Sequence, residues 1–246
     1  MKNIYFIFLL FLIGCSSSLP DSSVPLADHL KTGMDFLDQK KYVKAQEEFK
    51  FILSRGTGTD YGDDAQFFLA ESYFLNEQYL LSIQEYENLT RKMSYSPFFE
   101  KARFRICEAY RIESPKYYND QAYTEKALER YREFLDDFPT SKHSLTVTES
   151  MSVLRNKLAK KLYETGVLYM KLDEFEPARM SFNQALEQYY DTEIVENVHY
   201  EVIQSYLKEG KVNKAEKYWL TKGKEYIVQK TLINDLTSRF SQNKKQ

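Results

Sequence analysis

A four-residue pattern with fixed spacing recurs along this chain and limits its fold more than any other feature. It consists of a small residue, an aromatic residue three positions later, a small residue nine further on and an aromatic residue four beyond that. The four copies are Gly33, Phe36, Ala45 and Phe49; Ala70, Tyr73, Ser82 and Tyr86; Gly166, Tyr169, Ala178 and Phe182; and, with isoleucine first, Ile203, Tyr206, Ala215 and Trp219. Self-similarity of this kind indicates an array of repeated units.

The spacing has a packing reason in a pair of helices. Small residues let two helices approach closely, and aromatic side chains fill the space beside that contact. The composition agrees, because 20 Tyr and 17 Phe against 8 Gly and 6 Pro favour long helices over turn-rich β structure. The pattern resembles the tetratricopeptide repeat, a helix-turn-helix unit, which implies an all-α, right-handed solenoid of about five such repeats.

The third repeat carries an insertion. Its first helix contains Cys107 and Tyr110, and the pattern resumes with Ala127, Tyr131 and Phe134 after about eight extra residues. Pro115 and Asn119-Asp120 break helical periodicity, so we expect an elongated loop within Glu113 to Thr124. Pro139 should end the second helix, and a helix pair from about Ser144 to Lys157 should lead into the fourth repeat. The repeats are expected to start near residues 26, 63, 100, 159 and 196.

The first fifteen residues predict a lipoprotein signal. Lys2 precedes an apolar run from Ile4 to Ile13, which is too short to span a bilayer. The run ends in Leu-Ile-Gly-Cys, which resembles a lipobox and predicts cleavage before Cys15, with diacylglycerol on its sulfur and an acyl group on its amine. We therefore expect a signal peptide at 1–14, a lipidated tether at 15–25, the repeat domain at 26–235 and a polar tail at 236–246.

Catalytic and metal-binding patterns are not evident in this sequence. Cys107 occupies a small-residue position, where a buried structural thiol is expected. His29, His143 and His199 are scattered, without a second ligand at the spacing a metal site requires. A formal charge of −2 gives no field to attract nucleic acid. We expect no enzyme activity, and no cofactor besides the lipid on Cys15.

Binding is expected on the first helix of each repeat, which lines the inner groove of such arrays. Three positions face it: three before the small residue, one after it and four after it. In repeats one to three these positions hold Leu30, Met34, Leu37, Phe67, Glu71, Phe74, Phe104, Glu108 and Arg111. They predict an apolar channel for peptides with charged selectors, in which replacing Phe67 and Phe74 by serine would abolish capture and preserve helicity. The alternative is that these residues only pack between helices.

The order of lipobox, polar tether, five repeats and insertion resembles the BamD family, lipoproteins of the β-barrel assembly machinery. The most specific part of this resemblance runs from Ala127 to Trp219 and includes Phe-Pro-Thr-Ser and Ala-Arg-Met-Ser-Phe. The resemblance implies a scaffold on the periplasmic side of the outer membrane, anchored by lipid. It implies three kinds of partner: unfolded barrel precursors at repeats one to three, the barrel-forming core protein at repeats four and five, and other assembly lipoproteins.

Two other functions stay open. A periplasmic adaptor for peptidoglycan synthesis or cell division could be built on the same repeats, and so could a surface lipoprotein that captures a ligand. Ser16, after the lipidated cysteine, is not the acidic residue of the inner-membrane retention signal, which favours the outer membrane. The sequence leaves undecided the partners, the membrane leaflet, the oligomeric state and whether a peptide or the protein's own chain fills the groove.

Overall fold

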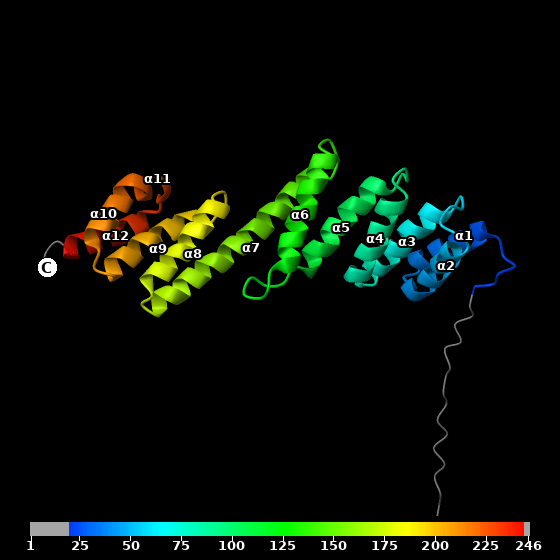
Figure 1. Ribbon diagram of the computed structural model, residues 1–246, viewed down its shortest axis with the longest axis horizontal. Coiled ribbons are helices and arrows are strands. Elements are labelled where there is room, and N and C mark those ends of the chain that lie inside the picture. The colour runs from blue at the N-terminus through cyan, green and yellow to red at the C-terminus, as the bar shows by residue number, and fades with distance from the viewer. Residues whose placement is uncertain (1–19, 244–246) are drawn as a thin grey trace, which may run out of the picture. The chain divides into compact units, whose positions relative to one another are not determined.

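The computed structural model describes residues 20–243. The predicted signal peptide and the lipidation site at Cys15 lie outside the described residues. The described chain is helical and divides after Phe99 into two compact units, which are described separately below. Helices that follow one another pack as antiparallel pairs within each unit (Figure 1), so the expected all-α architecture of helix pairs is confirmed.

The first unit contains the first two repeats. Its helices are α1 (Leu26–Asp38), α2 (Tyr42–Ser54), α3 (Gly62–Leu75) and α4 (Tyr79–Lys92). The small and aromatic residues of the pattern meet as predicted: a Cβ atom on Gly33 would lie only 2.6 Å from Cε1 of Phe49. Phe49 is fully buried, together with Ala45 and Ile52 of the same helix.

The second unit holds the rest of the array. Its helices are α5 (Phe99–Glu113), α6 (Ala122–Asp137), α7 (Ser144–Lys171), α8 (Phe175–Gln188), α9 (Val195–Lys208), α10 (Val212–Tyr218), the π-helix η1 (Trp219–Gly223), α11 (Lys224–Tyr226) and α12 (Lys230–Asn243). Gly166 lies against Phe182 as Gly33 lies against Phe49, so the pattern has the same physical meaning here. Helix α12 continues beyond residue 235, where we expected the polar tail to begin, and its Leu236 is buried.

The expected helix pair between Ser144 and Lys157 is wrong. That segment is the first half of α7, one unbroken helix of 28 residues. Its first half buries Val147, Leu154 and Leu158 against α5 and α6. Its second half buries Met170 in the core formed with α8 and α9. A single helix thus belongs to two successive cores.

The turn within four of the repeats has one backbone geometry. Lys40, Glu77, Asp173 and Gly210 have φ angles of 58°, 59°, 58° and 75°. The amide of the following residue donates to the carbonyl of the pattern aromatic, for example from Lys41 to Phe36 at 2.8 Å and from Lys211 to Tyr206 at 2.8 Å. This six-to-one bond with a left-handed residue is the Schellman arrangement that closes a helix. Only one of the four turns uses glycine, although the left-handed region favours it.

Replacing Glu77 by glycine should therefore stabilise the first unit. The left-handed conformation strains an L side chain, and relief of that strain should exceed the entropy that glycine adds to the unfolded chain. We expect a gain of about 0.5–1 kcal/mol in the free energy of unfolding, measured by urea titration. Gly210→Ala is the matched control and should lose about the same amount. A Glu77→Gly variant less stable than the parent would contradict this reading of the turn.

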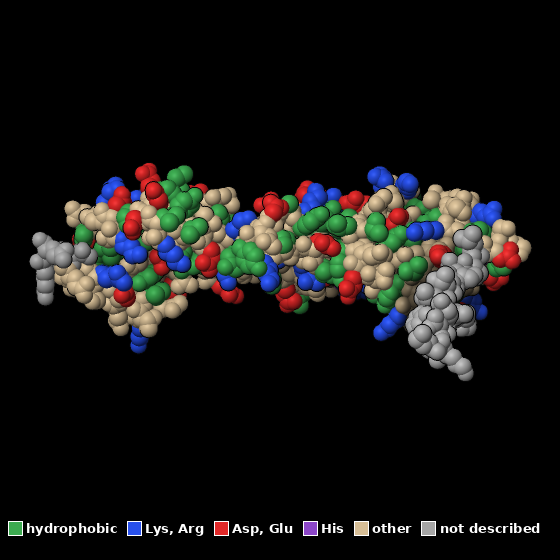
Figure 2. Space-filling view, turned by 90° about the horizontal axis from the view of Figure 1, so that it is seen from below, with side chains coloured by type: hydrophobic (Ala, Val, Ile, Leu, Met, Phe, Trp, Pro, Cys, Tyr) green, Lys and Arg blue, Asp and Glu red, His purple; other side chains and the backbone are tan. Residues whose placement is uncertain are grey.

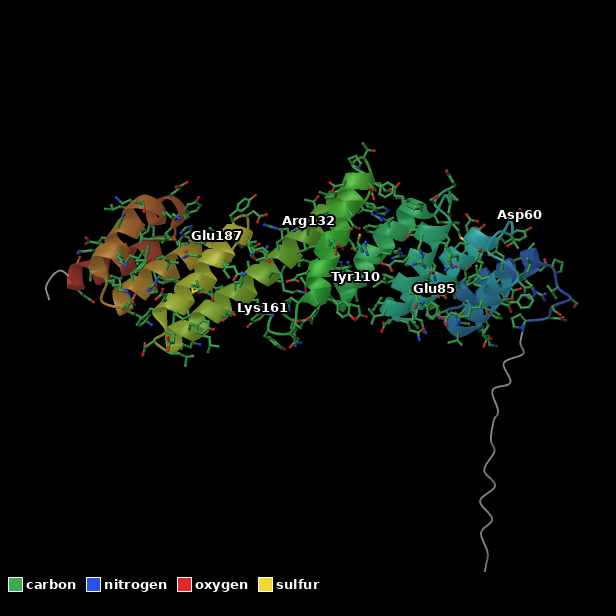
Figure 3. All side chains as sticks on the ribbon, viewed as in Figure 1. Asp60, Glu85, Tyr110, Arg132, Lys161 and Glu187 are labelled. Carbon is green, nitrogen blue, oxygen red and sulfur yellow. The ribbon has the colours of Figure 1, made fainter. Side chains whose placement is uncertain are left out.

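The predicted insertion is present as residues 114–121, between α5 and α6. Two lysines of α7 hold it: Nζ of Lys157 donates to Oγ of Ser114 at 2.7 Å, and Nζ of Lys161 donates to the carbonyl of Asn119 at 2.8 Å. Figure 3 labels Lys161 on α7. The insertion is thus fastened to the helix that follows it, in addition to the two helices it connects.

An acidic residue at the start of a first helix binds the loop that follows the second helix of the same repeat. Asp63 accepts a hydrogen bond from Oγ of Ser96 at 2.9 Å, and Glu100 accepts one from Oγ of Ser141 at 2.6 Å. Glu196 accepts bonds from the amides of Val228 and Gln229 at 2.8 and 2.7 Å. These acids lie at the predicted starts of repeats two, three and five, so each ties the start of its repeat to the loop at the end of the same repeat.

Candidate functional site

The predicted groove positions of the first unit differ in accessibility. Met34 is 40% exposed, whereas Leu30, Leu37 and Phe74 are half-buried. Leu30 and Leu37 pack against the core of α1 to α3, and the ring of Phe74 lies edge-on to Tyr79 at 5.3 Å. These four side chains can contact a ligand through part of their surface.

Phe67 is not accessible, because its side chain is fully buried. Its ring stacks on Phe98, 4.4 Å away at an interplanar angle of 11°, and contacts Phe68 and Tyr86 at 5.5 and 5.8 Å. Removing a buried phenylalanine typically costs about 3–5 kcal/mol. The Phe67 and Phe74 double substitution would therefore test folding as well as binding, and Phe67 does not belong in a binding test.

Glu71, one of the two expected acidic selectors, is also buried. Its carboxylate accepts a hydrogen bond from the Tyr86 hydroxyl at 2.6 Å. Tyr86 is a pattern aromatic and fully buried, and a buried tyrosine hydroxyl normally has a polar partner. In the first unit this acid therefore satisfies a core hydroxyl.

The same pairing recurs in the second unit, where the Tyr131 hydroxyl donates to Glu108. Arg111 donates to the same carboxylate, with Nη2 to Oε2 at 2.7 Å. Burial alone would raise the pKa of Glu108, but the hydrogen bonds from Arg111 and Tyr131 outweigh it and lower the pKa. Glu108 is therefore ionised at neutral pH and already has two donors, while part of Arg111 faces solvent.

Phe104 completes the set in the second unit. It is half-buried, and its ring stacks on His143 at 4.0 Å and 13°. His143 stands in the loop before α7 as Phe98 stands in the loop before α5, so the two ring stacks are equivalent. Burial lowers the pKa of His143, which favours the neutral ring against Phe104. Phe67 and Glu71 thus lie in the core. The remaining positions form two partly accessible strips: Leu30, Met34, Leu37 and Phe74 in the first unit, and Phe104 and Arg111 in the second.

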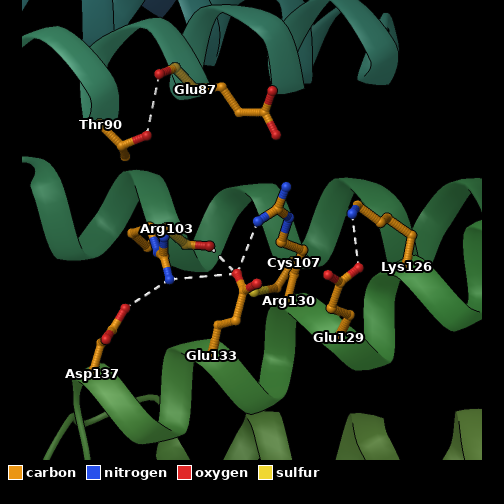
Figure 4. Close-up of polar contacts among 9 residues, drawn as sticks. All are labelled: Glu87, Thr90, Arg103, Cys107, Lys126, Glu129, Arg130, Glu133 and Asp137. Carbon is orange, nitrogen blue, oxygen red and sulfur yellow. Dashed lines mark hydrogen bonds and ion pairs between the residues drawn. The ribbon is translucent and has the colours of Figure 1, made fainter.

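Cys107 is buried as expected, and its thiol donates to the carbonyl of Arg103 at 3.2 Å. One turn before it on α5, Nη2 of Arg103 lies 2.7 Å from Asp137 and 3.6 Å from Glu133 (Figure 4). Among residues 20–243, no three His, Cys, Asp or Glu side chains come together as metal ligands would. The surroundings of Cys107 are those of a structural residue.

Cys107 should not react with Ellman's reagent in the native protein. Burial raises the pKa of its thiol to about 12, so the reactive thiolate is scarce at neutral pH. In a chain whose Cys15 sulfur is acylated, we expect no colour before denaturant is added and one equivalent of thiol after it. Release of thionitrobenzoate within seconds under native conditions would show that the helix pair opens readily.

Several features of the second unit were not anticipated. The structure has a cleft of about 500 Å³ lined by residues of α8, α9, η1 and α11, among them His199 and Tyr226. Another, of about 350 Å³, is lined by Trp219, Leu220 and Phe240. The excess of lysines between residues 208 and 230 is the sequence signal that could have drawn attention to this end of the second unit.

None of the helices within residues 20–243 is long and apolar enough to cross a bilayer.

Two solved structures resemble the chain distantly. A thermophilic tetratricopeptide-repeat protein from Thermus thermophilus shares 18% identity with a TM-score of 0.38, covering 89% of this chain and 98% of that one. A repeat protein from Bacteroides fragilis NCTC 9343 shares 13% with a TM-score of 0.43, covering 89% and 84%. Likenesses this distant carry no inference about function.

Sequence comparison is more informative. A relative from Rickettsia prowazekii (strain Madrid E), named outer membrane protein assembly factor BamD, is 26% identical over 226 residues, which are 88% of this chain and 87% of that protein. Residues 24–221 match the family described as YfiO, outer membrane lipoprotein. Because that match spans most of the chain, this protein belongs to the YfiO family of outer membrane lipoproteins.

Proposed function

We propose that this protein is a non-catalytic scaffold of the β-barrel assembly machinery, which binds unfolded barrel precursors and the barrel-forming core protein. The observation that carries the proposal is the family match over residues 24–221. The Rickettsia relative, an assembly factor by name, supports it over nearly the full length of both chains. Helix pairs that expose partly apolar strips suit a protein that binds other proteins.

The scaffold is held at the outer membrane, on its periplasmic side, by lipid on Cys15. The signal peptide is residues 1–14, and the tether begins at Cys15. The carbonyl of Asp21 accepts a hydrogen bond from Nε2 of His29 in α1, at 3.0 Å. Five residues lie between Cys15 and Asp21, so Cys15 can stand at most about 20 Å from this contact.

Co-purification tests the proposed function. The lipidated protein is isolated from gently solubilised membranes, and the proteins recovered with it are identified and quantified by mass spectrometry. The proposal expects a large outer-membrane barrel with periplasmic domains, in near-equal amount. Recovery of cell-wall or division proteins without such a barrel would instead support the periplasmic adaptor.

The accessible strip of the first unit is the proposed site for precursors, and its test needs residues that are not core residues. Replacing Met34 by serine and Phe74 by alanine removes apolar surface from α1 and α3 while Phe67 and Glu71 stay in place. We expect the affinity for a peptide copied from a transmembrane strand of an outer-membrane barrel to fall at least tenfold, because a few apolar anchors carry most of such binding. Fluorescence anisotropy of the labelled peptide measures this.

Val43→Ser is the matched control for that strip. Val43 is an exposed apolar residue of α2, the second helix of its repeat. It removes a comparable apolar side chain from outside the proposed groove, so peptide affinity should stay unchanged. Equal loss in the control, or none in the Met34 and Phe74 variant, would refute the groove assignment.

A further inference from the structure

Positive charge is concentrated near the C-terminal end of the second unit. Residues 208–230 contain seven lysines and three glutamates, and so carry a net charge of +4 in a chain whose formal charge is −2. Blue side chains are visible in Figure 2 among green ones over the end that carries α10 to α12. Such a local excess of one sign attracts partners of the opposite sign.

Three of these lysines belong to the α10–η1–α11 run. Lys214 and Lys217 lie about one turn apart on α10, and Lys224 begins α11 after the π-helix. All three are exposed, and none of them forms an ion pair with any residue between 20 and 243. Lys211 differs, because it is paired with Glu209. The three unpaired lysines are available to carboxylates from outside the chain.

Apolar side chains stand beside the lysines. Leu220 is 63% exposed and Val228 is 72% exposed. Leu220 and Trp219 line the cleft of about 350 Å³ together with Glu216 of α10 and Phe240 of α12. Exposed apolar groups next to unpaired cations are typical of a surface that is covered by a partner.

The second cleft lies beside the first, because both take residues from η1. Its volume is about 500 Å³, and Thr221 and Lys222 of η1 line it with Leu186, Tyr190, His199 and Tyr226 and with two acidic residues, Glu187 and Glu225. A π-helix is rare and is frequently found at functional sites. Here the π-helix places consecutive residues on two clefts, with Leu220 on one and Thr221 on the other.

His199, in the wall of the second cleft, is held in place by its neighbours and is uncharged at neutral pH. The imidazole is buried, its Nδ1 lies 2.8 Å from the Tyr218 hydroxyl, and its ring stacks on Tyr226 at 4.4 Å. Burial lowers the pKa of His199 to about 4, so the ring is neutral at pH 7. A held aromatic wall offers a preformed pocket for an apolar side chain, at little cost in ordering.

We infer that this surface binds an acidic segment of a partner protein, whose apolar side chains enter the two clefts and whose carboxylates meet Lys214, Lys217 and Lys224. Two separate clefts lined by residues of one π-helix fit a polypeptide with spaced anchors better than a lipid headgroup layer, which offers none. The inference rests on the proposed scaffold function and states the chemistry of one of its partners.

Trp219 gives a direct measurement, because it is the only tryptophan in the chain and it lines the first cleft. The full-length mature protein is titrated with a synthetic twelve-residue peptide that alternates Asp or Glu with Leu or Phe. We expect a saturable change in Trp219 fluorescence. A peptide with Asn and Gln in place of the acids should bind at least tenfold more weakly, and added salt should weaken the acidic peptide alone.

A triple variant identifies the cations. Lys214→Gln, Lys217→Gln and Lys224→Gln together should weaken the acidic peptide at least tenfold. The control Lys31→Gln, Lys44→Gln and Lys92→Gln removes three exposed lysines of the first unit and should bind like the parent. All six positions are on the surface, so the thermal midpoints of both variants should match that of the parent.

Two results would overturn the inference. One is equal binding of the acidic and neutral peptides. The other is a Trp219 response to phosphatidylglycerol vesicles with none to the acidic peptide, which would make this a membrane-facing surface. Recovery of the barrel in the co-purification experiment does not depend on either result, so failure here is distinguishable from failure of the proposed function.

Discussion

Gly166→Val is expected to lower the free energy of unfolding of the second unit by about 3 kcal/mol, since overfilling a well-packed core usually costs about 1–3 kcal/mol and valine adds three carbons. A Cβ atom at this position would lie 2.3 Å from Cε1 of Phe182 and 2.6 Å from its Cδ1. Phe182 is fully buried, so its ring has no solvent into which it could move. Urea unfolding followed by circular dichroism measures the loss.

Gly58→Ala is the control for that substitution. A Cβ atom on Gly58 would have no neighbour within 4 Å, so stability should change little. A double substitution, Gly166→Ala with Phe182→Leu, should be less destabilising than the sum of its parts, because the smaller side chain makes room for the new methyl group. Strict additivity, or a Gly166→Val protein as stable as the parent, would contradict the packing reason given for the repeat pattern.

Cys15→Ala is expected to abolish incorporation of labelled palmitate completely. The acyl transfer that anchors a lipoprotein needs the cysteine sulfur, and alanine offers no nucleophile. Each buried methylene contributes about 0.8 kcal/mol to membrane attachment, so a chain without its acyl groups loses its anchor. Metabolic labelling and the mass of the mature chain measure the effect, and membrane fractionation follows the consequence.

Cys107→Ala is the matched control, because it removes the other cysteine of the chain. It should retain the full palmitate label and the full mass increase that the acyl groups give. Palmitate retained in Cys15→Ala but lost in Cys107→Ala would show that Cys107 carries the lipid. That result would contradict the proposed tether.

Much of the fold could be predicted because the repeat pattern depends on direct contacts. Gly33 with Phe49 and Gly166 with Phe182 lie in contact, as their spacing requires. The insertion could be predicted because Pro115 interrupts helical periodicity. The continuity of α7 was missed because we expected a helix pair between Ser144 and Lys157 and a new repeat from about residue 159, although no proline interrupts this segment. When one helix contributes to two cores, the main sequence evidence for its continuity is that no helix-breaking residue interrupts it.

The candidate site was harder to predict for a physical reason. Aligning the repeats identifies equivalent positions but not their depth, which depends on the neighbouring loop. Phe67 is buried by Phe98, a residue of the loop before α5, and no pattern within the repeat reports that. Glu71 could have been recognised, because the buried hydroxyl of Tyr86 needs a polar partner. The basic C-terminal surface was missed because the charge was averaged over the whole chain.

The continuity of α7 also constrains how this array can change during evolution. Repeat proteins gain and lose units most easily by recombination in the loops that separate them, since each unit contacts only its neighbours. Between the third and fourth repeats there is no such loop, because one helix from Ser144 to Lys171 supplies both cores. A cut anywhere in that helix would expose apolar surface on both sides. Recombination should therefore keep the third and fourth repeats together. Under mechanical force the two repeats should unfold together.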